Sequence, residues 1–168
     1  MTAGTRQQRL MQRALHHVDE VKGKGEGVRS IYGGLCHRLP VLIRTCGLCA
    51  ALAFVHSKSQ GESGDGRREA HRLLLEHCGA ILSDHAGLGI GNGSGRELIN
   101  TVQGLDVRRA AAGEDRRDHL RELINTVQGL DVRGYVLAQR VLLEALVFHK
   151  RFAESVLGVE PGSGDERD

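Results

Sequence analysis

Apolar residues recur at helical spacing along most of the chain, and the first such segment covers residues 5 to about 21. Its apolar stripe consists of Leu10, Ala14, Val18 and Val21. This spacing predicts a helix with one face in the protein core. A different face of the same segment carries Arg6, Arg9, Arg13 and His16. That face is typical either of a solvated helix surface or of a stripe that contacts phosphates.

The most apolar part of the chain is the stretch 40–57. A shorter helix is predicted before it, over residues 28–38. Pro40 suits the first position of a new helix, because its missing N–H is not needed there. The strongly polar residues of the apolar stretch are Arg44, Thr45 and His56. Since a helix that is apolar on nearly every face is packed by neighbours on several sides, we predict that residues 40–57 form a central buried helix.

Two more long helices are predicted further along the chain. A polar, glycine-containing loop at residues 57–66 precedes the first, which covers residues 67 to about 85, with Asp65 as its N-cap. The second covers residues 135–157, most of which are apolar. The tail at residues 158–168 ends in PGSGDERD. Its composition is typical of a disordered segment.

A glycine-rich stretch and a tandem duplication separate these two helices. Residues 86–95 contain five glycines, and the sequence RELINTVQGLDVR occurs at residues 96–108 and again at 121–133. Two copies are too few for a solenoid. Only one copy can occupy a given groove in the core, and the second leads directly into the last helix. We therefore predict that the second copy packs in the core and that residues 86 to about 120 form a mobile, tolerant insertion.

These elements predict an all-α fold, a compact bundle of five or six helices around the central apolar helix. The domain boundaries are expected to be a single helical domain at residues 1–157, interrupted by the insertion, and the disordered tail. No segment has the length and pattern of a convincing strand.

Composition and charge narrow the class of protein. The chain has 168 residues, 23 Lys and Arg against 21 Asp and Glu, and 3% aromatic residues without Trp. An excess of two positive charges is too small for the whole molecule to attract nucleic acid, so any such binding requires a local patch. The first residues lack the apolar region of a secretory signal. No apolar stretch reaches membrane-spanning length, and we expect a cytoplasmic protein without a membrane partner.

The candidate reactive residues do not form a recognisable catalytic motif. Cys46 and Cys49 form a C-x-x-C, but no strand precedes it as in thioredoxin-like proteins. A zinc site would need further ligands such as Cys36, His37 or Cys78, whereas cysteines in so apolar a helix are usually small core residues. The histidines are scattered in the sequence, without a partner at a spacing that suggests a triad. We expect no enzymatic activity, no metal or other cofactor and no small-molecule substrate.

The remaining chemistry is a set of basic residues around the predicted bundle. Such side chains bind phosphates by charge and hydrogen bonding without reading sequence. Arg44 stands out because it lies in an otherwise apolar segment and needs a carboxylate, a subunit or a phosphate as partner. The candidate nucleic-acid-binding residues are Arg38, Arg44, Lys58, Arg67, Arg68, Lys150, Arg151, Arg6, Arg9 and Arg13.

The order of several short motifs resembles one known family. Tyr32, Leu39-Pro40, Ile43, Gly47-Leu48, Leu52-Ala53-Phe54 and Ser57-Lys58 follow one another in the first half. Tyr135, Glu144-Ala145-Leu146 and Lys150-Arg151-Phe152-Ala153 follow in the last helix. Together they resemble the small helical subunit of the Cmr complex, the type III-B CRISPR effector. Cys46 stands where the family tends to have a polar residue, and residues 86–121 cannot be mapped onto the family pattern.

The resemblance implies a non-catalytic subunit that stacks in two or more copies within a ribonucleoprotein. It would line the channel that holds the duplex of crRNA and target RNA, together with other subunits of the effector complex in antiviral defence. Base pairing reads sequence in guided systems, so the protein need only hold backbone and shape. Two other interpretations stay open: a helical protein–protein adaptor without nucleic-acid contact, and a sensor of metal or redox state built on the cysteines.

Overall fold

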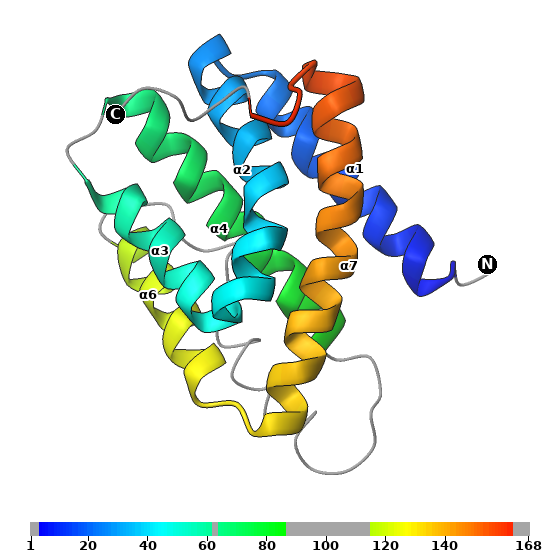
Figure 1. Ribbon diagram of the computed structural model, residues 1–168, viewed down its shortest axis with the longest axis vertical. Coiled ribbons are helices and arrows are strands. Elements are labelled where there is room, and N and C mark those ends of the chain that lie inside the picture. The colour runs from blue at the N-terminus through cyan, green and yellow to red at the C-terminus, as the bar shows by residue number, and fades with distance from the viewer. Residues whose placement is uncertain (1–3, 62–63, 87–114, 163–168) are drawn as a thin grey trace.

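The computed structural model describes residues 4–61, 64–86 and 115–162, and the described residues form helices without a strand (Figure 1). The helices are α1 (Arg6–Lys22), α2 (Glu26–Cys46), α3 (Leu48–Gln60), α4 (Asp65–Ala86), α6 (Asp115–Gln128) and α7 (Val132–Leu157). The predicted all-α bundle is confirmed. Helix α7 packs along α1 and α2, while α4 packs against α2 and α3.

Local sequence signals define the ends of the first and last helices. Thr5 caps α1: its Oγ1 accepts from the Gln8 amide at 3.2 Å, and the Gln8 side chain accepts from the Thr5 amide at 2.7 Å. This reciprocal capping box satisfies two amides that have no partner inside the helix. Asp131 caps α7 by accepting from the Gly134 amide at 2.7 Å.

The predicted central helix at residues 40–57 is wrong in its boundaries. Helix α2 continues through Pro40, and the break falls at Gly47. Gly47 has φ +85°, a backbone conformation that side-chain-bearing residues adopt at a cost. A Cβ atom at this position would also lie 2.9 Å from the Tyr135 hydroxyl. The prediction placed the start of a helix at Pro40. The helix instead tolerates this proline in its interior and ends at Gly47.

The apolar stretch is therefore divided between two helices that are buried on one side. Ile43, Leu48, Leu52 and Val55 are buried, but Arg44 is exposed and Val41 is 56% exposed. The prediction that Arg44 lies in apolar surroundings is wrong, because the end of α2 faces solvent on that side. The flanking loop is also shorter than predicted, since α3 extends to Gln60 and Asp65 is itself the first residue of α4.

The second copy of the duplicated sequence contributes to the core, as predicted. Within α6, Leu120, Leu123 and Val127 are 6% exposed or less. Helix α6 packs on α3 and α4, and Leu123 lies against Gly79 of α4. Residues 115–120, which the prediction assigned to the insertion, belong to this helix. The first copy, at residues 96–108, and the predicted mobile linker lie outside the described residues.

The beginning of the predicted disordered tail packs against the bundle. Val159 is 6% exposed and covers Gly33 of α2, where a Cβ atom would lie 2.5 Å from the valine Cβ. The His37 Nε2 atom lies 3.2 Å from the Val159 carbonyl oxygen. The prediction of disorder is therefore wrong for Val159. It rested on the polar composition of the tail as a whole and did not consider this one apolar side chain. Residues 163–168 lie outside the described part.

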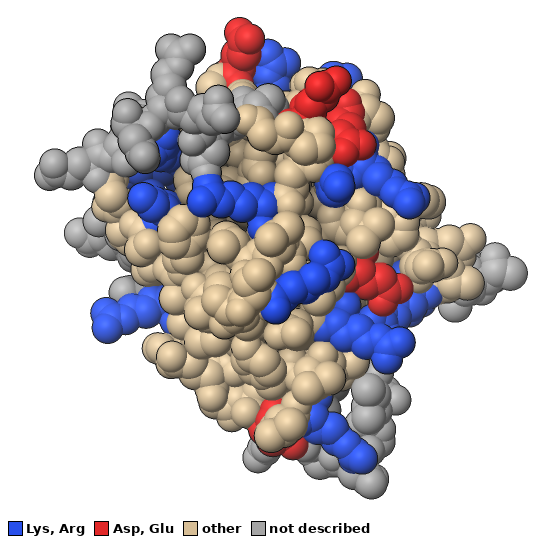
Figure 2. All heavy atoms as spheres, viewed as in Figure 1, with Lys and Arg blue, Asp and Glu red and all other residues tan. Residues whose placement is uncertain are grey.

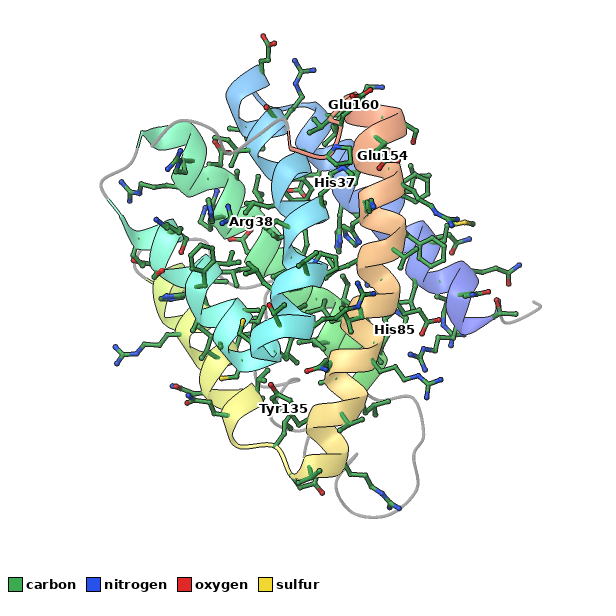
Figure 3. The ribbon with its side chains drawn as sticks, in the orientation of Figure 1. His37, Arg38, His85, Tyr135, Glu154 and Glu160 are labelled. Atoms are coloured by element: carbon green, nitrogen blue, oxygen red, sulfur yellow. The ribbon has the colours of Figure 1, made fainter. Side chains whose placement is uncertain are left out.

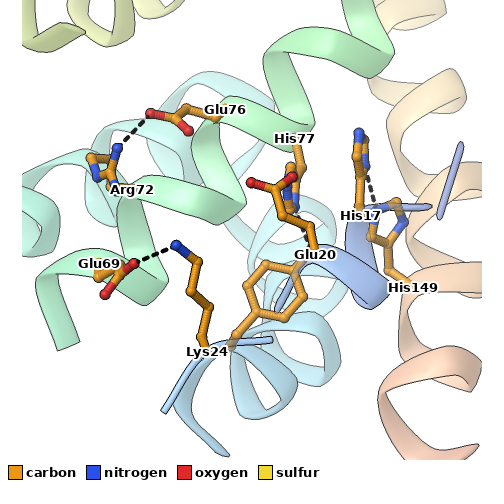
Figure 4. A network of polar contacts seen from close by, with 9 residues as sticks. His17, Glu20, Lys24, Glu69, Arg72, Glu76, His77 and His149 are labelled. Atoms are coloured by element: carbon orange, nitrogen blue, oxygen red, sulfur yellow. Dashed lines mark hydrogen bonds and ion pairs between the residues drawn. The ribbon is translucent and has the colours of Figure 1, made fainter. Parts of the chain in front are cut away.

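A buried polar network joins α1, α2, α4 and α7 (Figure 4). The rings of His17 and His77 stack with centroids 4.0 Å apart, and His17 Nδ1 lies 3.1 Å from His149 Nε2. The Tyr32 hydroxyl lies 2.7 Å from His77 Nδ1, and Glu20 lies 3.4 Å from His77 Nε2. The expectation that the histidines are scattered is wrong, because folding brings distant helices together at this point.

Candidate nucleic-acid interface

Three of the predicted basic residues converge where α2, α3 and α4 meet. Phe54 of α3 is half-buried, and the guanidinium carbon of Arg38 lies 6.0 Å from the centre of its ring. The Lys58 ammonium lies 5.9 Å from the same ring. A cation over an aromatic face is attracted by the quadrupole of the ring. Phe54 therefore attracts two positively charged side chains to one aromatic ring.

His71 links Arg67 to this pair. Its Nδ1 atom donates to the Arg67 carbonyl oxygen at 2.7 Å, one turn earlier in α4. Burial lowers the pKa of His71, and the charges of Arg67, Lys58 and Arg38 lower it further. Because all three cations act on one buried ring, they belong to a single electropositive region. We name Arg38, Lys58 and Arg67, with Phe54 and His71, the α2–α4 basic cluster.

Four of the other predicted residues lie on the surface without entering this cluster's described contacts. Arg44 is exposed near the end of α2, and Arg68 follows Arg67 as a half-buried residue of α4. Lys150 and Arg151 are exposed in the second half of α7. Figure 2 shows that Lys and Arg are spread over the viewed face with broad uncharged areas between them. The structure thus groups only part of the predicted set.

The arginines of α1 belong to a different region. Arg6 forms an ion pair with Glu144 of α7 at 2.7 Å, and Arg13 forms one with Asp84 of α4. Arg9 donates to the Gly4 carbonyl oxygen at 2.7 Å. His85 of α4 lies near these arginines. Figure 3 shows Arg38 and His85 on opposite sides of α2. The predicted stripe is therefore partly neutralised and separate from the α2–α4 basic cluster.

The four cysteines have different surroundings. Cys36 and Cys78 are buried, which raises the pKa of both thiols, that of Cys78 to about 12. Cys46 is exposed and Cys49 is half-buried, so the prediction of a core position is wrong for Cys46. The thiol of Cys46 donates to the Leu42 carbonyl oxygen at 3.0 Å. Among the described residues, no three His, Cys, Asp or Glu side chains are grouped so that they could hold a metal ion.

Within the described ranges, no helix combines the length and the apolar character that crossing a membrane requires.

The described residues define the class of protein as a small helical bundle with a local basic cluster on its surface. Comparison with known sequences is more specific. The family described as CRISPR-associated protein (Cas_Cmr5) matches residues 6–156, and the chain belongs to this family. The resemblance noted in the sequence is thus confirmed.

Two relatives agree with this assignment. The chain is 40% identical over 78 residues to the CRISPR system Cmr subunit Cmr5 of Thermus thermophilus. This match covers 46% of the chain and 60% of that relative. A crystal structure of a CRISPR-associated Cmr5 family protein, also from Thermus thermophilus, is similar with a TM-score of 0.58 and 30% identity. The similarity covers 92% of the chain and 98% of the other protein.

Sequence reasoning missed His71 and His85 as parts of basic regions. Each is a buried histidine near basic side chains that include residues of other helices: Arg38 and Lys58 for His71, and Arg6, Arg9 and Arg13 for His85. Helical spacing indicates which face of a helix is apolar, but it does not indicate which neighbouring helix covers that face. The available signal was His71 one turn after Arg67, a spacing that places the two residues on the same face of a helix.

Proposed function

We propose that this chain is a non-catalytic small subunit of a type III-B CRISPR RNA-guided effector, the Cmr complex. In this proposal it stacks in several copies with the other subunits and lines the channel that holds crRNA and target RNA. Membership of the Cas_Cmr5 family supports a place in that complex. The observation that carries the RNA contact is the convergence of Arg38, Lys58 and Arg67 around Phe54 and His71.

The cluster suits a sequence-independent contact with a backbone. Arg38 and Lys58 are exposed, and their charges are held on one aromatic ring. Charged groups of this kind displace counterions from phosphates and give affinity without specificity. In a guided complex the RNA strands supply specificity by pairing. A subunit of this type needs no reactive group.

The experiment compares RNA binding by assembled complexes across a range of salt concentrations. Complexes contain either the native chain or a chain with both Arg38→Glu and Lys58→Glu. We expect about tenfold weaker binding for the variant, and a slope of log affinity against log salt that is shallower by roughly 0.7–0.9 for each lost phosphate contact. The matched control is Arg133→Glu, because Arg133 is exposed at the other end of the bundle, in the first turn of α7.

Equal affinity and equal slope for native and double-variant complexes would contradict the proposed RNA contact. If assembly is then normal, the adaptor interpretation takes its place. Failure of the variant to enter the complex is detected separately, by the stoichiometry of the purified assembly. A loss of binding with Arg133→Glu as large as that of the double variant would also count against the cluster, since it would indicate a general effect of charge.

A further inference from the structure

A pocket between α1 and the end of α4 forms a second basic region. Its volume is about 470 Å³, and it is lined by Arg9, Gln12, Arg13, His16, Asp84 and His85. Four of these residues come from successive turns of α1 and two from the last turn of α4. Figure 3 shows His85 on the opposite side of α2 from Arg38. The pocket is therefore distinct from the α2–α4 basic cluster.

His85 lines this pocket and has a buried ring nitrogen without a hydrogen-bond partner. The residue is 4% exposed, and its buried Nδ1 atom has no hydrogen-bond partner. A buried polar atom without a partner costs free energy, and most such atoms in native proteins are satisfied. Burial lowers the pKa of His85, as do the charges of Arg9, Arg6 and Arg13. The ring is therefore neutral at physiological pH and carries one N–H donor.

Of the arginines in and next to the pocket, Arg9 has a charge that no carboxylate pairs within the described residues. Arg13 is paired with Asp84, and Arg6, next to the pocket, is paired with Glu144. Arg9 donates one N–H to the Gly4 carbonyl oxygen, and in the described part of the chain it forms no ion pair. A guanidinium has five N–H donors. Arg9 thus retains its positive charge and several donors in the pocket that His85 also lines.

We propose that this pocket binds a phosphate group of an RNA backbone. Arg9 supplies the charge and two or more donors, and the rings of His85 and His16, which also line the pocket, supply further donors. A phosphate presents several oxygens in different directions, whereas the carboxylate of an acidic protein side chain presents two in one plane. Donors spread over two helices and a pocket wider than a carboxylate favour the phosphate. This inference rests on the proposed function, to which it adds a second and separate contact.

The test follows the ring nitrogens of His85 by NMR in the isolated full chain labelled with ¹⁵N-histidine. The probes are inorganic phosphate, a short single-stranded RNA and a poly-glutamate peptide. We expect saturable shifts of the His85 nitrogens with phosphate and with RNA. Arg9→Gln should weaken binding of both about tenfold. Arg121→Gln is the matched control, because Arg121 is an exposed arginine of α6 and should leave both titrations unchanged.

Each other outcome overturns the proposal. Shifts with inorganic phosphate alone would assign the pocket to a free phosphate, and shifts with poly-glutamate alone would assign it to a protein partner. No shift with any probe, or equal binding by Arg9→Gln, would show that the pocket takes no anion. Because Arg9 is exposed, the Arg9→Gln variant should fold. These titrations do not involve Arg38 or Lys58, so failure here is distinguishable from failure of the salt-dependence experiment.

Discussion

His17 donates a hydrogen bond from Nδ1 to Nε2 of His149 in the core, across 3.1 Å. The direction follows from the next contact. His149 Nδ1 lies 2.9 Å from the Ala145 carbonyl oxygen, and since a carbonyl only accepts, that nitrogen carries the proton. In a neutral ring the Nε2 atom is then an acceptor. Protonation of His149 at Nε2 would remove this acceptor and place a charge in the core.

The first prediction is a loss of stability in mild acid. Burial lowers the pKa of His149 to about 4 and that of His17 further still, whereas both titrate near 6.5 when unfolded. The unfolded chain therefore binds more protons below about pH 6.5, and stability falls as pH falls through that range. The loss is about 1 kcal/mol per pH unit for each histidine. Urea unfolding should give roughly 2 kcal/mol less at pH 5.5 than at pH 7.5.

One variant isolates a contribution of the buried pair. His149→Gln, which cannot titrate, should reduce the dependence of unfolding free energy on pH. The part that remains reports on His17 and on the other buried histidines whose pKa burial lowers, His71 and His85. Stability that is flat from pH 7.5 to 5.5 in the native chain would show that the pair is not held neutral.

The second prediction concerns the break between α2 and α3. Gly47→Ala should lower the free energy of unfolding by about 1–3 kcal/mol, because φ is positive and the added Cβ meets the Tyr135 hydroxyl. In a Tyr135→Phe background the same substitution should cost less, since the clashing oxygen is gone. Gly27→Ala in α2 is the control: nothing lies within 4 Å of its Cβ position, so it should be neutral or stabilising.

The position of this break also shows how far sequence reasoning reaches. The spacing of apolar residues was sufficient to predict the class of fold. Residues such as Leu10 and Val18 face the core of a helical bundle whichever helices pack against them. The spacing was not sufficient for the boundary, because proline and glycine are both typical of helix ends, and this stretch contains Pro40 and Gly47. At Gly47 a side chain would meet the hydroxyl of Tyr135, 88 residues later in the sequence, and the spacing of apolar residues does not indicate that contact.

The basic regions likewise depend on contacts between residues far apart in the sequence. Charge pattern identified Arg38, Lys58 and Arg67 as candidates, but their convergence depends on packing of α2, α3 and α4 around Phe54. The same charge pattern included Arg13, which the fold pairs with Asp84. A list of basic residues therefore contains both grouped and neutralised side chains. Tertiary contacts decide between the two.

The third prediction uses the duplication as its own control. Leu123 is 3% exposed and packs in the core, so Leu123→Ala should cost about 2–4 kcal/mol of stability. Leu98 is the identical position of the first copy, which lies outside the described residues. We expect Leu98→Ala to change the free energy of unfolding by less than roughly 0.5 kcal/mol. Equal losses in denaturant unfolding would indicate that both copies pack in the core.

The last prediction concerns assembly. Val132 and Val136 are 83% and 59% exposed and lie one turn apart at the start of α7, so they present a common apolar face. Charge at an exposed position rarely affects the stability of an isolated chain, but it opposes burial against another protein. Val136→Glu should leave the unfolding free energy within about 0.5 kcal/mol of native and reduce the number of copies in the purified complex. Gln139→Glu, at a half-buried polar position of the same helix, is the matched charge control. Full incorporation of Val136→Glu, measured by native mass spectrometry, would show that this face does not contact a neighbour.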